Sequence, residues 1–208
     1  MGTDTGQSRA LRAWHWLRRE IVPLLAMLLL LTAARSSFAN HYVVPSGSMQ
    51  NTLMPGDRVA VDMSAYGLRL PYTSVRLIER GRPQRGDVVV FDSPRDGTRL
   101  IKRAVAVAGD RVELRDGWLR INGVALQSMA LAGTEDFGAH RARLDLGAGG
   151  GPDIHGLTIP PGKLLVLGDH RGDSFDGRYF GLVDADRVYG KALAVYYRRG
   201  EGLAWIRL

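Results

Sequence analysis

Turn signals divide most of this chain into short apolar runs. From residue 56 onward they recur roughly every eight to twelve residues, and the pairs Asp116-Gly117 and Asn122-Gly123 favour tight hairpin turns. The runs between them are rich in β-branched residues, as in residues 87–91, which is typical of buried strands. No long amphipathic helical pattern follows residue 34. The spacing therefore predicts a mainly β fold.

Composition limits the number and kind of domains. The 208 residues suffice for one domain of moderate size, or for a domain that carries a smaller insertion. Hydrophobic residues make up 45% and charged residues 24%, as in ordinary globular proteins. Residues 129–153 have little pattern and many glycines and alanines, which predicts a loop or a reduced lobe inserted at about 112–158. The absence of cysteine excludes disulfides, thiolate–zinc sites and a cysteine nucleophile.

The N-terminus combines a basic stretch with an uncharged one. Residues 1–20 contain arginines beside Trp14 and Trp16, the pattern of the cytoplasmic flank of a membrane helix. Residues 21–34 carry no charge, and we predict a transmembrane anchor at 21–39. A short apolar run behind a basic stretch is also typical of a cleavable signal peptide, for which residues 37–39 offer a small-x-small site. Either interpretation places residues 40–208 outside the cytoplasm.

The chain is basic, with a formal net charge of +7. Such a charge indicates nucleic acid or an anionic membrane surface as a partner. The arginines are scattered, and no recognition helix, zinc finger or aromatic RNA-binding motif accompanies them. We therefore predict contact with membrane lipid and none with nucleic acid.

Ser46 and Ser48 flank Gly47 in a turn that Pro45 stiffens. Proline fixes one backbone dihedral angle and glycine permits conformations that other residues avoid, so such a turn can aim a hydroxyl group. Two serines beside a glycine are also common in ordinary loops. The turn alone leaves both a nucleophile and a plain loop open.

Lys102 lies within an apolar strand pattern at residues 100–105. In one interpretation the side chain sits at a strand edge and points into water. In the other, burial lowers the pKa of the amine and leaves it neutral, so that it can take a proton from a serine. Arg103, the next residue, keeps its charge and cannot act as this base.

A polar, glycine-rich segment covers residues 168–181, between two predicted strands. Such loops disproportionately carry functional sites. Asp169, His170 and Ser174 offer the residue types of a Ser-His-Asp triad, although a triad requires that the groups converge in space. The other histidines show no paired spacing with carboxylates, so we predict no metal site.

Three segments together resemble type I signal peptidases, the membrane-bound serine proteases with a Ser/Lys dyad. They are Pro45-Ser46-Gly47-Ser48-Met49 with the following Thr52-Leu53 and Gly56-Asp57, Ile101-Lys102-Arg103-Ala104-Val105 with Gly109-Asp110, and residues 168–181. Their order and approximate spacing match the family. The departures are Asn51 in place of the usual proline, His170 in place of asparagine and Gly177 in place of serine.

The resemblance implies a β-rich catalytic domain with an inserted second β domain, and it suggests roles for single residues. Ser48 takes the place of the nucleophile and Lys102 that of its base, and no cofactor is required. It also implies that Ser174 orients the lysine and that Asp176 and Arg178 form an ion pair that holds the loop. Met49 and Ile101 are expected to line the substrate groove. We expect the Ser46 hydroxyl and the Ser48 backbone N–H to meet the oxyanion.

The function that the resemblance implies is cleavage of signal peptides from exported preproteins after small-x-small sites. The enzyme is then expected to cross the cell (inner) membrane once, with its N-terminus in the cytoplasm and its catalytic domain on the periplasmic side. One alternative is a specialised, conjugation-type maturation peptidase of the same family. Others are a self-cleaving Ser/Lys regulator, which the apolar anchor and the lack of a DNA-reading motif disfavour, and a non-catalytic, membrane-tethered β module that binds a partner.

Overall fold

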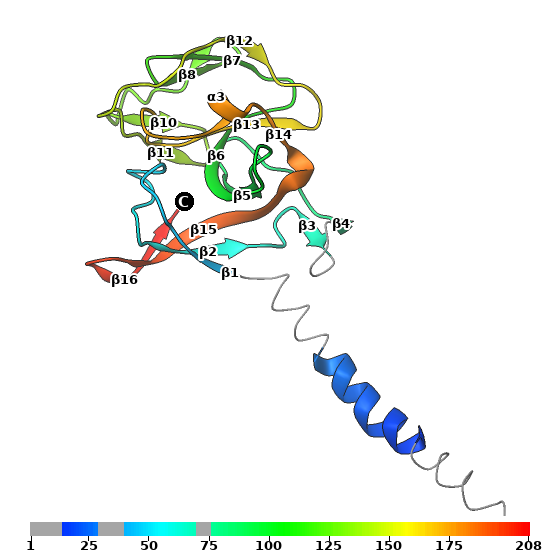
Figure 1. Ribbon diagram of the computed structural model, residues 1–208. Helices are drawn as coiled ribbons and strands as arrows, with labels where there is room; N and C mark the ends of the chain where they lie inside the picture. The colour runs from blue at the N-terminus through cyan, green and yellow to red at the C-terminus, as the bar shows by residue number, and fades with distance from the viewer. Residues whose placement is uncertain (1–13, 29–39, 70–75) are drawn as a thin grey trace, which may run out of the picture.

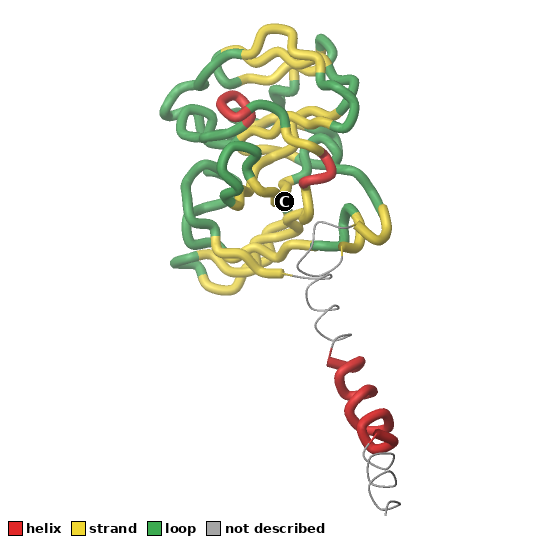
Figure 2. Tube along the Cα trace, turned by 45° about the vertical axis from the view of Figure 1, so that its right-hand side comes forward, coloured by secondary structure: helices red, strands yellow, loops and turns green. Residues whose placement is uncertain are grey.

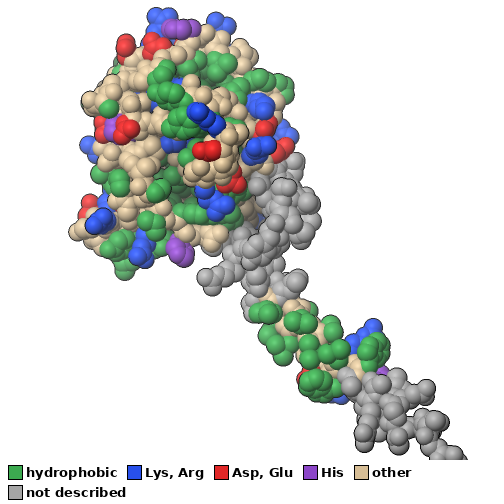
Figure 3. Space-filling model, in the orientation of Figure 1, with side chains coloured by type: hydrophobic (Ala, Val, Ile, Leu, Met, Phe, Trp, Pro, Cys, Tyr) green, Lys and Arg blue, Asp and Glu red, His purple; other side chains and the backbone are tan. Residues whose placement is uncertain are grey.

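The computed structural model describes a helix at residues 14–28 and a β domain at residues 40–69 and 76–208 (Figure 1). The middle turn of the helix, η1 (Leu17–Ile21), is π-helical. Apolar side chains are exposed along this helix, among them those of Leu24, Leu25 and Leu28 (Figure 3). Within the described ranges, no helix has both the length and the apolar character needed to cross a membrane. The predicted anchor continues through residues 29–39, which lie outside the described residues, so the anchor stays a prediction.

The main sheet contains eight strands, and every pairing within it is antiparallel. Its order is β1-β2-β15-β5-β6-β13-β14, and β16 also pairs with β15. The bounds are β1 (Asn40–Val43), β2 (Arg58–Asp62), β5 (Val88–Asp92), β6 (Arg99–Val107), β13 (Lys163–Leu167), β14 (Val183–Asp184), β15 (Val188–Arg198) and β16 (Gly202–Arg207). The mainly β fold predicted from the turn spacing is confirmed.

Strand β5 is apolar at successive positions because both of its faces are buried. Val88 and Val90 pack in one core cluster, with Val59 and Val61 of β2. Val89 and Phe91 pack in another, with residues of β6, β13 and β15. Because successive side chains of a strand point to opposite faces, a strand that is covered on both faces needs apolar residues without alternation.

Between β6 and β13 the chain leaves the main sheet and forms a smaller lobe at one end of it (Figures 1 and 2). This lobe contains a four-stranded sheet in the order β12-β7-β8-β9 and a hairpin of β10 and β11. The bounds are β7 (Arg111–Arg115), β8 (Trp118–Ile121), β9 (Val124–Ala125), β10 (Thr134–Asp136), β11 (Arg141–Arg143) and β12 (Ile154–Thr158). A third core cluster joins the four-stranded sheet to β6 and β13.

The hairpin of β10 and β11 lies where the sequence shows little pattern. Its strands read Thr-Glu-Asp and Arg-Ala-Arg, and the side chains of Thr134, Glu135 and Ala142 are buried. Tertiary contacts, and not strand propensity, therefore stabilise it. The remaining described elements are the hairpin of β3 (Gly67–Arg69) and β4 (Arg76–Glu79), the short helix α3 (Gly177–Phe180) and the 3₁₀ turn η2 (Ala185–Arg187).

Candidate active site

The serine turn, residues 44–57, connects β1 to β2 and is closed by backbone hydrogen bonds. Val44 N–H donates to the Asp57 carbonyl over 2.9 Å, and Gly56 N–H donates to the Val44 carbonyl over 2.8 Å. Met49 and Leu53 have no exposed surface and pack in the core beneath the turn. This packing fixes the turn while Ser46 stays exposed and Ser48 half-buried.

Lys102 lies on β6, between β5 and β13 in the main sheet. It is only 3% exposed, so the interpretation of a lysine that points into water is wrong. Its Nζ lies 2.5 Å from Ser48 Oγ and donates a hydrogen bond to it. The fold thus brings together a hydroxyl and an amine that are 54 residues apart in sequence.

Burial lowers the pKa of the Lys102 amine from 10.5 to about 8. The cause is the loss of solvation of the charged form, and the nearby carboxylates of Asp176 and Asp169 oppose the shift without cancelling it. A substantial fraction of the amine is therefore neutral in mildly alkaline solution. A neutral amine in contact with a hydroxyl can accept its proton.

The Ser46 hydroxyl lies close to the same point. Its Oγ is 3.3 Å from Ser48 Oγ, within hydrogen-bond distance, and either oxygen can be the donor. Because it is exposed and adjacent to the Ser48 oxygen, this hydroxyl can also donate to an oxygen atom of a group that Ser48 attacks.

Ser174 does not make the contact that was expected of it. Its Oγ is buried and has no hydrogen-bond partner among the described residues, so it does not orient the Lys102 amine through a hydrogen bond. The amine donates to Ser48 instead. Ser174 still lies beside the serine turn, because a Cβ atom added to Gly168 would overlap both Ser174 Oγ and the Ser48 carbonyl oxygen.

Asp176 and Arg178 form a buried ion pair, with 2.8 Å between Arg178 Nη2 and Asp176 Oδ2. The same Oδ2 accepts a hydrogen bond from Gly168 N–H over 2.9 Å. Arg178 Nη1 also donates to the Gly150 carbonyl of the inserted lobe over 2.7 Å. The pair therefore closes the loop of residues 168–178 on itself and joins it to the lobe.

Asp169, His170 and Ser174 do not form a triad. Both carboxylate oxygens of Asp169 accept hydrogen bonds from Arg103, and His170 Nδ1 is buried with no hydrogen-bond partner among the described residues. Ser174 Oγ has none either. A histidine base that lacks both its serine and its orienting carboxylate cannot act as a triad requires.

The sequence of this chain matches a known protein family. The model of the family described as signal peptidase, peptidase S26, matches residues 16–197. The chain belongs to this family. Signal peptidase I of Pseudomonas fluorescens is 34% identical over 203 residues, which cover 86% of this chain and 70% of that protein. Signal peptidase I of Bacillus licheniformis is 30% identical over 189 residues, which cover 90% of both chains. The chain is also similar to the crystal structure of a signal peptidase I from Enterococcus faecalis, with 33% sequence identity and a TM-score of 0.39. The match covers 60% of this chain and 97% of the Enterococcus faecalis chain.

A buried ion pair that the sequence did not predict supports the site of this S26 peptidase. Arg103 and Asp169 are joined by 2.7 Å between Nη2 and Oδ2, and their side chains are 0% and 1% exposed. Arg103 Nη1 donates to the Gly86 carbonyl over 2.6 Å, and Asp169 Oδ2 accepts from Thr52 of the serine turn over 2.5 Å. The pair thus ties the serine turn, β6 and the loop after β13 together. The one sign of this ion pair in the sequence was Arg103, a charged residue inside an apolar strand pattern.

The inserted lobe of the peptidase also contacts both active segments. Arg171 of the loop pairs with Glu135 of β10 over 2.6 Å, and both side chains are fully buried. Asn51 of the serine turn donates through its backbone N–H to the Arg143 carbonyl and through Nδ2 to the Leu144 carbonyl, over 3.3 and 3.1 Å. A proline at this position would have no N–H for the first of these bonds. Asn51 therefore gives the turn a direct link to the lobe.

The two residues expected to line the substrate groove differ in position. Met49 has no exposed surface, so it supports the turn from below and does not line an open groove in this structure. Ile101 is half-buried and lines a hollow of about 190 Å³, whose lining includes the residues that directly precede Ser46 and Lys102 in the chain. This dyad hollow is lined by Tyr42, Val43, Val44, Pro45, Val90, Arg99, Leu100 and Ile101.

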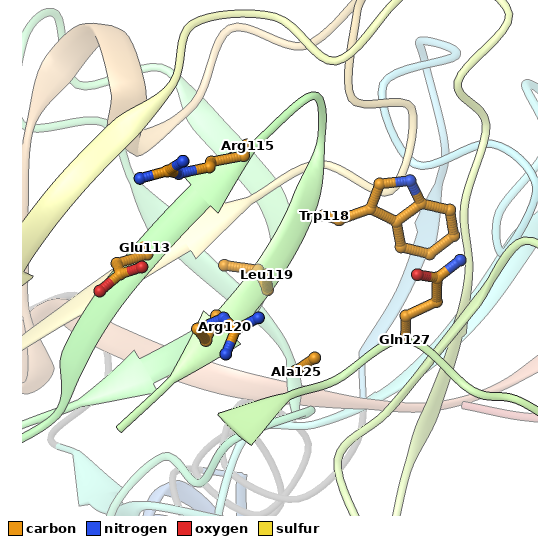
Figure 4. A pocket seen from close by; sticks show the side chains of 7 residues that line it. All are labelled: Glu113, Arg115, Trp118, Leu119, Arg120, Ala125 and Gln127. Carbon is orange, nitrogen blue, oxygen red and sulfur yellow. The ribbon is translucent and has the colours of Figure 1, made fainter. Parts of the chain in front are cut away.

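A larger hollow, of about 420 Å³, lies on the inserted sheet, and none of its lining residues belongs to the serine turn or to β6 (Figure 4). It is lined by Glu113, Arg115, Trp118, Leu119, Arg120, Ala125 and Gln127. Across residues 14–28, 40–69 and 76–208, no group of three or more histidine, aspartate or glutamate side chains could hold a metal ion.

We expect Gly168→Ala to disturb the site strongly. The added methyl group would overlap Ser174 Oγ and the Ser48 carbonyl oxygen, so the loop or the serine turn must move. The free energy of unfolding should fall by about 1–3 kcal/mol, and peptidase activity by about tenfold or more. Denaturant unfolding and cleavage of a peptide substrate measure the two effects. In the control Gly147→Ala the methyl group meets Asp145 Oδ1 at 3.1 Å, and equal results for the two variants would contradict the prediction.

Proposed function

We propose that this chain is a serine endopeptidase that removes signal peptides from exported preproteins with a Ser48/Lys102 dyad. The observation that carries the proposal is the 2.5 Å contact between Ser48 Oγ and the Nζ of a lysine that is 3% exposed. Family membership supports the substrate class, because the relatives that match most of the chain are signal peptidases.

In the first step, neutral Lys102 takes the proton of Ser48 while Ser48 Oγ attacks the scissile carbonyl. Lys102 then gives this proton to the leaving amine as the C–N bond breaks, which leaves an acyl-serine. A water molecule next loses a proton to Lys102 and attacks the acyl group. The proton returns to Ser48 as the signal peptide leaves with a free carboxylate, so the enzyme is restored without a cofactor.

The negative charge on the carbonyl oxygen needs hydrogen-bond donors. The Ser46 hydroxyl, 3.3 Å from Ser48 Oγ, and the Ser48 backbone N–H are the donors that we propose. One such donor typically lowers the activation free energy by about 2.7–4 kcal/mol. Ser174 belongs to the same proposal as a positioning residue, which acts through its packing against Gly168 and the serine turn.

We propose cleavage after small-x-small sites, because the relatives that match most of the chain are signal peptidases. Ile101, which lines the dyad hollow, is the proposed wall of the substrate groove.

We also propose a membrane location, on the periplasmic side of the cell membrane, with the N-terminus in the cytoplasm. The uncharged run at residues 21–34 and the arginines that precede it support an anchor at residues 21–39. Residues 40–208 then form the catalytic domain, with the lobe at about 112–158 inserted in it, and the cytoplasmic part is residues 1–20.

The test is to incubate the full chain in detergent with a preprotein and to determine the new N-terminus by mass spectrometry. Cleavage after a small-x-small site supports the proposal. Cleavage of one specialised substrate alone would instead support a maturation peptidase of the same family. No cleavage of any preprotein would leave a non-catalytic, membrane-tethered β module and overturn the proposal.

The rate should depend on pH through the lysine. Because only the neutral amine can take the serine proton, kcat/KM is expected to rise with pH through an apparent pKa of about 8 and to level off above it. Peptide cleavage measured from weakly acidic to alkaline conditions tests this. A rate that does not change over this range would argue against an amine as the base.

A further inference from the structure

Arg99 introduces a positive charge into a hollow that is otherwise apolar or aromatic. The dyad hollow lies between the end of β1 and the start of β6, and its lining includes Pro45 and Ile101, which directly precede Ser46 and Lys102 in the chain. A peptide whose scissile carbonyl lies at Ser48 can therefore extend along this hollow. Of the eight lining residues, Arg99 is the one with a charged side chain.

Aromatic rings hold the guanidinium group of Arg99 in place. Its Cζ lies 5.0 Å from the ring centroid of Tyr189 and 5.7 Å from that of Tyr42. Its Nη1 lies 3.5 Å from the Tyr42 hydroxyl, to which it donates a hydrogen bond. Such cation–π contacts fix the direction of an arginine side chain while its charge stays accessible. The side chain is 54% exposed, so an incoming peptide can meet it.

Asp92 is the nearest carboxylate to Arg99, and it does not line the hollow. Its Oδ1 lies 3.5 Å from Arg99 Nε and accepts a hydrogen bond from the Tyr189 hydroxyl over 3.0 Å. The carboxylate therefore binds the Nε edge of the guanidinium group, whereas Nη1 points toward Tyr42 in the lining. The charge that faces the hollow is positive.

We propose that Arg99 is a specificity-determining residue of this peptidase. It favours an acidic or polar side chain, and disfavours lysine and arginine, at the substrate position whose side chain reaches the rim of the dyad hollow. This inference rests on the proposed function and adds a charge preference to the preference for small residues. An apolar rim would discriminate by size alone.

The test compares peptides that share one small-x-small site and carry glutamate, glutamine or lysine at each position around the cut in turn. In the unmodified full chain, at one position the kcat/KM for glutamate should exceed that for lysine. In Arg99→Gln this ratio should fall by about threefold to tenfold, the size expected when one partly exposed charge attracts one peptide and repels the other. Arg99→Lys should keep most of the ratio, and Arg99→Glu should invert it.

Two further measurements separate charge recognition from a structural effect. Raising the salt concentration to about 1 M, where the screening length is about 3 Å, should reduce the ratio in the unmodified enzyme and leave that of Arg99→Gln unchanged. Arg120→Gln, which removes an arginine from the inserted lobe, should keep the full ratio. An unchanged ratio in Arg99→Gln at every position would overturn the inference. Cleavage of the glutamine peptides by all variants tests the proposed function separately, because it does not depend on this charge.

Discussion

Lys102→Met is expected to abolish preprotein cleavage and, at the same time, to stabilise the fold. Methionine has no group that can take the Ser48 proton, so the rate should fall by about 10²- to 10⁴-fold or more. The amine is buried, and its pKa is lowered to about 8 because desolvation disfavours its charged form. Replacing the amine with an apolar side chain removes the desolvation free energy that the buried charged form costs the folded state. We therefore expect a higher midpoint of denaturant unfolding at neutral pH, measured beside the cleavage assay.

The stability difference should itself depend on pH. Below a pH of about 8 the lysine is charged in both the folded and the unfolded chain, and the folded state bears the full cost. From about 8 to the ordinary value of 10.5, the folded state has lost the proton and the unfolded state still binds it. In this window the free energy of unfolding of the unmodified protein therefore rises with pH relative to that of Lys102→Met. The difference in stability between the two proteins becomes smaller. A variant that was both inactive and unfolded would give no support to a catalytic role.

Two other single variants complete this prediction. Ser48→Ala should be as inactive as Lys102→Met, because the nucleophile is lost. His170→Ala should retain most of the activity, because the contact of His170 with the serine turn is made by its backbone N–H, which donates to the Ser48 carbonyl over 3.2 Å. Loss of activity in the histidine variant alone would reverse the assignment.

Arg103→Met is expected to be among the most destabilising single changes in the domain. It leaves the Asp169 carboxylate, 1% exposed, without its charged partner. An unpaired buried charge of this kind typically lowers the free energy of unfolding by about 3–5 kcal/mol. Activity should fall as well, because the pair fixes Thr52 of the serine turn relative to β6. Urea unfolding measures the loss.

The double variant Arg103→Met/Asp169→Leu tests the reason for this loss. It removes both charges, so it should recover much of the stability, since a buried ion pair often contributes little more than apolar residues of similar volume. The control is Arg141→Met, because Arg141 and Asp136 form a pair with side chains 63% and 38% exposed. That change should leave stability nearly unchanged. A small effect of Arg103→Met, similar to that of the control, would contradict the prediction.

The strands of the main sheet could be predicted because their signals are local. Residues 88–91 are apolar without alternation because both faces of β5 are covered, and the turns between strands contain glycine and asparagine where tight turns need them. The hairpin of β10 and β11 could not be predicted in this way. Its buried Glu135 depends on Arg171, which lies 36 residues further along the chain.

The residues of the proposed dyad could be singled out from the sequence, but two interpretations of each remained. Burial decides between those for Lys102, since a lysine with 3% exposure cannot be a strand-edge residue in water. The structure also corrects two finer expectations. Ser174 makes no hydrogen bond to the lysine because the amine donates to Ser48, and Met49 is not at the surface because it packs under the serine turn.

The sequence by itself determined the fold class and the family resemblance, and it indicated Ser48 and Lys102 as candidates, because strand patterns and short motifs involve residues close together along the chain. Only the tertiary structure decided which groups meet. The distance between Ser48 and Lys102, the pairing of Asp169 with Arg103 and the position of Arg99 at the dyad hollow all join segments distant in sequence. The lowered pKa of Lys102 is decided in the same way, because it depends on the solvent that the surrounding strands and loops exclude.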